Sequence, residues 1–437
     1  MKKLVSILLT LTLLFSLSAA AMAEETGDNI VIQFWHTRGS GTSYEGLKES
    51  VDNFNATIGK EKGITVQETF IGDYTAIMTK TQLSVQSGEQ PQIVVASNTN
   101  TAPLVEDGIL VDMMPYAEKS GFDVSNLMDC FMQIYGNTDG QLHSLPYIRS
   151  TPLFYYNKTM ADAKGLTISS NPTIDEMVEF CKGLYEVDEN GEVLVYGLEI
   201  VSDFGYFQAA NLQQLGSALL ADDGMSAPSL EDGTMLKVLT DWRSWVDEGW
   251  CRSFDATNAG DTMQQLFFQN KLGGFFNSSA GMRSITENCA EAGIELGVTY
   301  YPTYDAEKPV AEIGGGQIGI VGQGNSEEQI AAAWEFVQYL MSDEQITLTS
   351  KTTGYLPTTK SVANYEGMIE FWNENPLFKV AYDQLLENGV CQEKPYVPYL
   401  QDYTQYCADA VSLLIQEKSI TPEEAVQQIV DTSSILF

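Results

Sequence analysis

The sequence has few basic residues and almost no histidine. Its 437 residues include 23 Lys and Arg against 59 Asp and Glu, and the two histidines are His36 and His143, so the formal net charge is -36. A chain this acidic repels polyanions, and nucleic acid is therefore not expected as a partner. Two histidines, together with cysteines that never show C-x-x-C spacing, leave little from which to build a zinc site. We expect no metal and no other cofactor.

Common catalytic motifs are also absent. The chain has no G-x-S-x-G, H-E-x-x-H or G-x-x-x-x-G-K-[ST]. It does have G-x-G-x-x-G at Gly314, Gly316 and Gly319, but a dinucleotide loop needs a helix that starts at the glycines. Here a strand-like pattern continues past Gly319, and the next helix is predicted only at Ser326, where a capping box begins. The glycines indicate a bend, a close backbone approach, or bare N–H groups that face a ligand.

A long hydrophobic run occurs only at the N-terminus. Lys2 and Lys3 precede an apolar stretch, and Ala21 and Ala23 occupy the -3 and -1 positions of a cleavage site. We expect residues 1–23 to be a signal peptide and the mature protein to be exported to the periplasm or the outer face of the cell membrane. Export permits disulfides among the six cysteines, but buried thiols suit a chain of this size equally well, and both remain open.

The first third of the mature chain alternates strands and helices. Strands are predicted at 30–35, 64–71 and 92–97, with helices at 43–57 and 73–89 between them. The order βαβαβ favours a parallel sheet covered by helices, with ligands outside the carboxyl ends of its strands. This places Trp35, Tyr74 and Ser97 around one crevice. Aromatic residues at such positions, including Tyr206 and Tyr355, suit the apolar C–H faces of polyols, although core packing is the alternative for each.

Several motifs, in consistent order, resemble the carbohydrate-type extracellular solute-binding proteins of ABC importers. They are "FWH" at 34–36, "STPLFYYNK" at 150–158, "NSSAGM" at 277–282, "IGGGQIGI" at 313–320, "TGYLPTTK" at 353–360 and "TPEEAV" at 421–426. The resemblance implies a two-lobe α/β fold of the periplasmic-binding-protein type II, each lobe a mainly parallel sheet flanked by helices, with the ligand in the interlobe cleft. The implied N-terminal lobe comprises residues 24–148 and 312–356, and the C-terminal lobe 149–311 and 357–437.

The resemblance also implies ligand contacts, and the sequence departs from the family's pattern at two places. The contacts fall on Tyr74, Ser150, Ser278 or Ser279, Gly315 and Tyr355, and a stacking role falls on Tyr206 with Phe204 as a second candidate. Trp35 and Gly316 complete the expected set. An acidic contact of glycerol 3-phosphate binders falls on Ser97, and their late arginine falls in 395–401, which has no basic residue. Three arginines near ligand-facing segments suit an acidic sugar or a structural role equally: Arg38, Arg149 and Arg283.

The expected function is therefore that of a non-enzymatic binding protein. It captures a carbohydrate or related polyol by hinge closure, as a monomer, and delivers it to the transmembrane subunits of an ABC permease. An exported glycoside hydrolase acting on similar carbohydrates is the alternative, and it predicts a buried carboxylate with a raised pKa in the cleft. A surface receptor that feeds a sensor is a third possibility.

Overall fold

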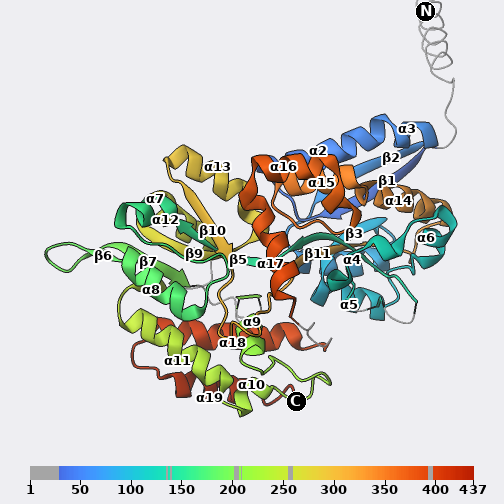
Figure 1. The fold of residues 1–437 in the computed structure, drawn as a ribbon. Coiled ribbons are helices and arrows are strands. Elements are labelled where there is room, and N and C mark those ends of the chain that lie inside the picture. Colours follow the sequence, from blue (N-terminus) through green and yellow to red (C-terminus); the bar gives the residue numbers. More distant parts are fainter. Residues whose placement is uncertain are drawn as a thin grey trace, which may run out of the picture.

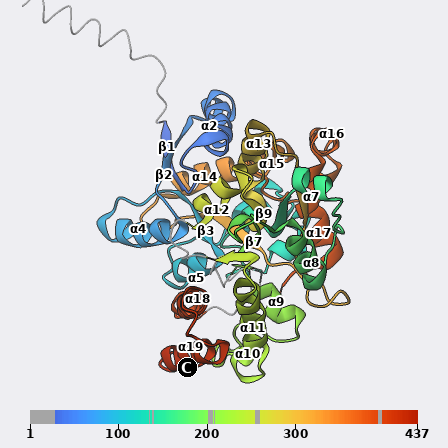
Figure 2. The same cartoon turned by 90° about the vertical axis from the view of Figure 1, so that its left-hand side faces the viewer.

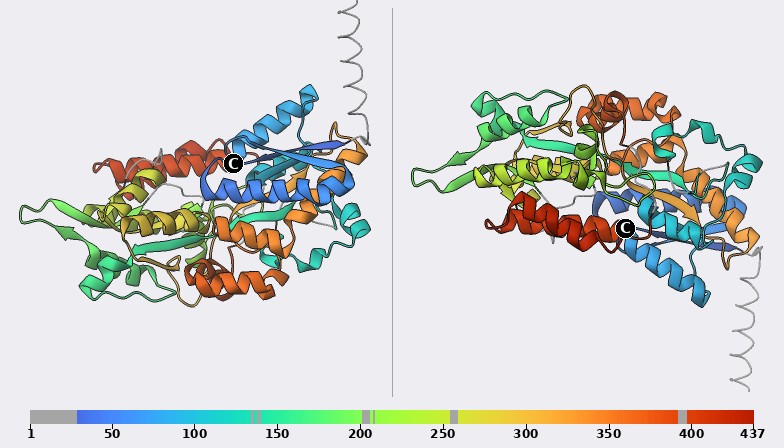
Figure 3. Two further views of the ribbon diagram at one scale, coloured as in Figure 1. Left: turned by 90° about the horizontal axis from the view of Figure 1, so that it is seen from above. Right: turned by 90° about the horizontal axis from the view of Figure 1, so that it is seen from below.

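Two mixed β-sheets, each covered by helices, form the framework of the protein (Figure 1). The computed structural model describes residues 29–133, 136–137, 140–200, 206–207, 209–253, 259–391 and 397–437. The predicted signal peptide and Phe204 lie outside these residues. Viewed from above and below, the elements around the two sheets occupy opposite ends of an elongated molecule (Figure 3).

The first sheet has five strands in the order β2-β1-β3-β11-β4. Their bounds are Ile64–Phe70 for β2, Ile30–His36 for β1, Ile93–Ser97 for β3, Gly314–Ile320 for β11 and Leu145–Ser150 for β4. The three strands predicted from the βαβαβ pattern pair in parallel, whereas β11 runs antiparallel to both β3 and β4. The prediction of parallel pairing is therefore confirmed for the first three strands but not for the whole sheet.

Successive side chains along the strands of this sheet pack into two separate cores, one on each face. Ile32 and Phe34 of β1 join the core under α2 and α14, while Trp35 joins the core under α4. Successive side chains of a strand point to opposite faces, which explains the division. The helices of this part of the chain are α2 Gly41–Ala56, α3 Ile58–Lys62, α4 Tyr74–Ser87, α5 Asn98–Glu106, α6 Met114–Ser120, α14 Glu327–Leu340 and α15 Asp343–Thr352.

The second sheet has six strands, five of them in the order β10-β5-β9-β7-β6, with β8 also paired to β7. Their bounds are Leu296–Tyr300 for β10, Pro152–Asn157 for β5, Leu272–Ser278 for β9, Val193–Ile200 for β7, Glu186–Val187 for β6 and Cys251–Ser253 for β8. Only the pairs β7–β8 and β7–β9 are parallel, so among the described strands this sheet is not mainly parallel as expected. The α/β two-lobe prediction itself is confirmed.

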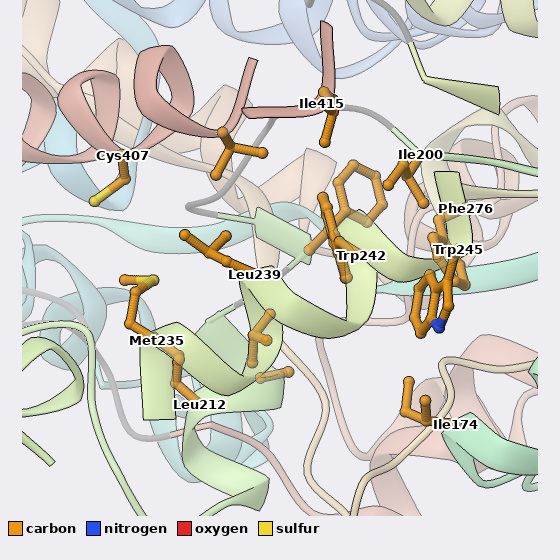
Figure 4. Close-up of a cluster of buried hydrophobic side chains, with 14 of the residues drawn as sticks. Ile174, Ile200, Leu212, Met235, Leu239, Trp242, Trp245, Phe276, Cys407 and Ile415 are labelled. Atoms are coloured by element: carbon orange, nitrogen blue, oxygen red, sulfur yellow. The ribbon is translucent and has the colours of Figure 1, made fainter. Parts of the chain in front are cut away.

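Helices cover the second sheet on both faces. On one face, Phe154 and Phe276 share a core with Trp242 and Trp245 of α11, and Figure 4 shows these α11 indoles among the aliphatic side chains. Helices α11, α18 and α19 contact one another at one end of the molecule (Figure 2). The helices of this part are α7 Lys158–Lys164, α8 Ile174–Leu184, α9 Ala209–Gln214, α10 Pro228–Glu231, α11 Thr234–Asp247, α12 Ala259–Phe268, α13 Met282–Ala292, α16 Glu366–Glu374, α17 Val380–Asn388, α18 Leu400–Gln416 and α19 Pro422–Ser433.

All six cysteines lie among the described residues and are thiols, five of them buried. Burial raises the pKa of the Cys130 thiol to about 11 and that of Cys289 to about 12. Thiols with such pKa values are poor nucleophiles at neutral pH. Of the two alternatives left open by the sequence, the structure has buried thiols.

Candidate functional site

The chain passes from one sheet to the other at Thr151. Strand β4 ends at Ser150 in the first sheet, and β5 begins at Pro152 in the second. Gly314, the first residue of β11, pairs with Ser150 across the first sheet. The Thr151 hydroxyl donates a hydrogen bond of 2.9 Å to the backbone carbonyl of Glu312, which fixes the chain before β11 against the same crossing. Two sequence-distant segments therefore meet where the sheets join.

Three hydroxyl groups converge at this junction, and we call them the hydroxyl cluster: Ser150, Tyr206 and Ser278. The Tyr206 hydroxyl donates to Ser278 Oγ over 3.1 Å and lies 3.3 Å from Ser150 Oγ. Ser150 ends β4 and Ser278 ends β9, so the tyrosine connects the two sheets. Gly314 makes room for it, because a Cβ at this glycine would lie 2.4 Å from Tyr206 Cε2. All three residues are among the predicted ligand contacts, and in the structure both serine hydroxyls lie within hydrogen-bonding distance of the Tyr206 hydroxyl.

Ser279 lies beside the cluster but has a structural role. It is 1% exposed, its N–H donates to the Thr151 carbonyl over 2.9 Å, and its hydroxyl accepts from the Thr151 N–H over 3.3 Å. These two bonds tie the end of β9 to the crossing segment. Of the two serines that the resemblance left open, Ser278 contacts Tyr206 and Ser279 holds the backbone.

Gly315 and Gly316 allow close approaches within the first sheet. Gly315 has φ +85°, and a Cβ there would lie 1.9 Å from the Ile148 carbonyl oxygen, so only glycine fits. The register between β11 and β4 shifts at Gly316, and a Cβ on Gly316 would lie 2.8 Å from Tyr74 Cε1. The G-x-G-x-x-G spacing thus lies in a strand and serves backbone and ring packing. Among the described residues, no helix begins between Gly314 and Glu327, so these glycines lack the helix of a dinucleotide loop.

The hydroxyls of Tyr74 and Tyr355 lie close to each other next to these glycines. Tyr74 is the first residue of α4, which Asp73 caps by accepting the Ala76 N–H over 2.7 Å. Burial is the first cause that raises the pKa of the Tyr74 hydroxyl, and the nearby Tyr355 hydroxyl adds to the effect. Burial likewise raises the pKa of Tyr355. Both hydroxyls are therefore neutral at physiological pH and available as hydrogen-bond donors and acceptors.

Two buried arginines flank the tyrosine pair. Arg149, 1% exposed, donates to Asn98 Oδ1 and to Gln317 Oε1, each over 3.0 Å. Arg38 is 5% exposed, and its guanidinium carbon lies 5.8 Å from the centre of the Tyr355 ring. Both cations lie near enough to Tyr74 to lower its pKa, although burial prevails. Neither arginine is among the predicted contacts, because the burial of both depends on distant segments that the sequence alone does not place.

Two predicted contacts differ from this group: Trp35 packs in a separate core, and Ser97 pairs with Gly316 across the first sheet but uses its hydroxyl to cap a helix. Trp35 is 8% exposed in the core under α4, and the Lys80 ammonium lies 4.5 Å above its ring. Ser97 caps α5: its hydroxyl donates to Asn100 Oδ1 over 2.5 Å and accepts the Asn100 N–H over 3.3 Å. The structure therefore gives both residues structural partners. The third arginine of the sequence analysis, Arg283, donates from Nε to the Lys351 carbonyl over 2.7 Å.

A buried carboxylate lies in the second sheet, on β7. Glu199 is 1% exposed, and burial raises its pKa to about 7, against the opposing effect of Arg252, whose Nη1 lies 2.8 Å from Glu199 Oε2. The described residues contain no group of three or more His, Cys, Asp or Glu placed to hold a metal ion. Within the same residues, no helix combines the length and the apolar character needed to cross a bilayer.

Comparison with known proteins shows what kind of protein this is. The sequence profile of the bacterial extracellular solute-binding proteins matches residues 49–380. The chain belongs to this family. Among its relatives, the sn-glycerol-3-phosphate-binding periplasmic protein UgpB of Rhizobium meliloti (strain 1021) is 24% identical over 381 residues, covering 86% of this chain and 84% of that protein.

Solved structures of similar proteins share the fold. The UgpB of Mycobacterium tuberculosis in complex with glycerophosphocholine matches with a TM-score of 0.79 at 19% identity, over 94% of this chain and 98% of that one. The maltose-bound MalE3 of T. maritima matches with a TM-score of 0.76 at 18% identity, over 93% and 100%. Membership of the solute-binding family makes the chain a binding protein and not an enzyme, and the hydrolase alternative is not supported. Burial accounts for the raised pKa of Glu199, whose carboxylate is paired with Arg252.

Proposed function

We propose that this solute-binding protein captures a carbohydrate or related polyol between its two lobes and delivers it to the transmembrane subunits of an ABC importer outside the cell membrane. We assign residues 24–148 and 312–356 to one lobe and residues 149–311 and 357–437 to the other. The names of similar proteins support this ligand class, since they include binders of glycerol 3-phosphate and of maltose. The protein acts as a monomer, and its charge of -36 disfavours nucleic acid.

The hydroxyl cluster is the observation that carries the proposal. Ser150 belongs to the first sheet, Ser278 to the second, and Tyr206 is hydrogen-bonded to both. A polyol offers several hydroxyls that can exchange hydrogen bonds with such groups, and an apolar face that stacks on an aromatic ring. We assign solute contacts to the hydroxyl cluster, to Tyr74 and Tyr355, and to the backbone at Gly315 and Gly316. Trp35, Ser97 and Ser279 support the structure around them.

Contacts from both lobes couple binding to closure. A solute that touches Ser278 and Tyr355, which belong to different lobes, has more contacts when the lobes are close than when they are apart, and it therefore favours the closed state. A direct contact between elements of the two lobes lies at Thr42, whose hydroxyl is 3.3 Å from Glu287 Oε2 of α13. A permease that recognises the closed state would then receive loaded protein.

A thermal-shift screen of the mature protein against oligosaccharides, uronic acids, polyols and glycerophosphodiesters tests the proposal. A binder should show a higher melting temperature with one class of solute, because ligand binding to the folded state stabilises it. Chromatography after incubation should recover that solute unchanged. Turnover of a glycoside, or no shift with any of these classes, would refute the function proposed.

A further inference from the structure

Arg38 is a buried cation without a counter-charge among the described residues. It follows β1 and is 5% exposed; its Nη2 is shielded from solvent and donates to no acceptor there. No described carboxylate lies within 4.0 Å of its guanidinium. The group meets aromatic faces instead, with its central carbon 5.5 Å from the Tyr147 ring centre and 5.8 Å from that of Tyr355. A buried charge of this kind is destabilising unless something pairs with it.

Arg243 shows how the same protein satisfies a buried guanidinium. It is 9% exposed, and its Nε lies 2.8 Å from Asp247 Oδ2. Its Nη1 donates to the Leu414 carbonyl over 2.6 Å and its Nη2 to the Lys418 carbonyl over 2.7 Å. Arg243 therefore holds α11 against the end of α18. Arg38 has no comparable set of acceptors, so a structural role does not account for it.

A carboxylate in the same region, that of Glu68, is already engaged. Glu68 accepts from the Tyr44 hydroxyl over 2.8 Å and bonds to His36 Nε2 over 2.7 Å. His36 Nδ1 accepts the backbone N–H of Arg38 over 3.2 Å, so Nε2 carries the proton donated to Glu68. Burial lowers the pKa of His36, which keeps it neutral. This chain of bonds anchors the backbone of Arg38 and leaves its guanidinium for another partner.

We propose that Arg38 binds an oxyanion of the solute, a phosphate or a carboxylate, at the Tyr355 side of the site. The inference rests on the proposed function and narrows it to anionic solutes. Tyr355 connects Arg38 to the rest of the site, because its ring lies beside Arg38 and its hydroxyl lies close to that of Tyr74. A planar guanidinium can donate two parallel hydrogen bonds to an oxyanion. Arg38 thus supplies positive charge beside Tyr355 and near Tyr74.

Calorimetric titration of the mature protein tests the inference with four probes: glycerol 3-phosphate, glucuronate, glycerol and maltose. We expect binding of one of the two anions and much weaker binding of both neutral compounds; which anion binds distinguishes phosphate from carboxylate. Arg38→Met should weaken the binding of the anion by about 30-fold or more, since it removes one partner of a buried charge pair. Lys80→Met is the matched control, because it removes a cation above the Trp35 ring outside the site. Its affinity should stay within about twofold of the wild type.

The melting temperature without solute separates binding from structure. Arg38→Met should melt at or above the wild-type temperature, because methionine removes an uncompensated buried charge. A lower melting temperature with undiminished anion affinity would show a structural role and overturn the inference. Tight binding of maltose that Arg38→Met leaves unchanged would overturn it while supporting the proposed function. If no solute of any class binds the wild type, the proposed function fails first.

Discussion

Replacing Gly314 with alanine should impair solute binding while leaving the fold intact. The added Cβ would lie 2.4 Å from Tyr206 Cε2 and 3.1 Å from Ser150 Oγ. Carbon atoms in contact prefer about 3.5–4.0 Å, so the ring has to move by roughly 1 Å. The hydrogen bonds from the Tyr206 hydroxyl, now 3.1 and 3.3 Å long, would then break. The side chain can move, because its far end is what the new methyl group meets.

The expected loss of affinity follows from the displaced hydroxyl, which no longer reaches the solute. Losing one or two hydrogen bonds between Tyr206 and the solute, each worth about 0.5–1.5 kcal/mol net, costs about 0.5–3 kcal/mol of solute binding, or about 2- to 150-fold in Kd. Chemical denaturation should show a change of less than about 1 kcal/mol in the free energy of unfolding, since alanine reduces the entropy of the unfolded chain and water can replace the lost partners. Calorimetric titration with the solute found in the screen measures the affinity.

Gly315→Ala is the informative companion of this variant. Here the Cβ meets the Ile148 carbonyl oxygen at 1.9 Å, and the backbone has φ +85°, so β11 and β4 must separate. We expect a loss of about 3 kcal/mol or more in the free energy of unfolding. Wild-type affinity in Gly314→Ala would refute the assignment of Tyr206 to the solute. Wild-type stability in Gly315→Ala would refute the conclusion that only glycine fits at position 315.

Two further predictions concern residues away from the solute. Trp35→Ala should lower the free energy of unfolding by about 3–5 kcal/mol in a denaturant titration, because Trp35 lies in a core. The solute affinity of the folded protein should stay within about twofold of the wild type. A loss of affinity without a loss of stability would show that Trp35 contacts the solute. The raised pKa of Glu199, about 7 against 4.5, makes wild-type stability fall as pH rises through this interval, by up to about 3 kcal/mol. Glu199→Gln should therefore gain stability relative to the wild type between pH 5 and pH 8, and equal pH dependence of the two would contradict the burial of the charge.

Local patterns in the sequence predicted much of the first sheet. The strands Ile30–His36, Ile64–Phe70 and Ile93–Ser97 follow from hydrophobic runs bounded by helical periodicity. The capping box at Ser326 is present, with Gln329 returning the bond to the Ser326 N–H. Such features depend on neighbours within a few residues, and they are legible without knowledge of the fold.

Long-range pairing was not predictable in the same way. Strand β11 enters the first sheet between β3 and β4, more than 150 residues from either in the sequence, and it runs antiparallel to both. The packing of Trp35 in a core was not predictable for the same reason, because the pattern of β1 does not show which of its two faces meets the solute. The burial of Arg38 depends on Tyr147 and Tyr355, which reach it from distant segments.

The central claim is that one solute contacts both lobes at once, and calorimetric titration of two single variants tests it most directly. Tyr355→Phe removes a hydroxyl from the lobe of residues 24–148 and 312–356, and Ser278→Ala removes one from the other lobe. Each should weaken binding of the same solute by about 2- to 13-fold, the value of one neutral hydrogen bond. An affinity lost in only one of the two variants, or kept in both, would contradict a solute held between the lobes.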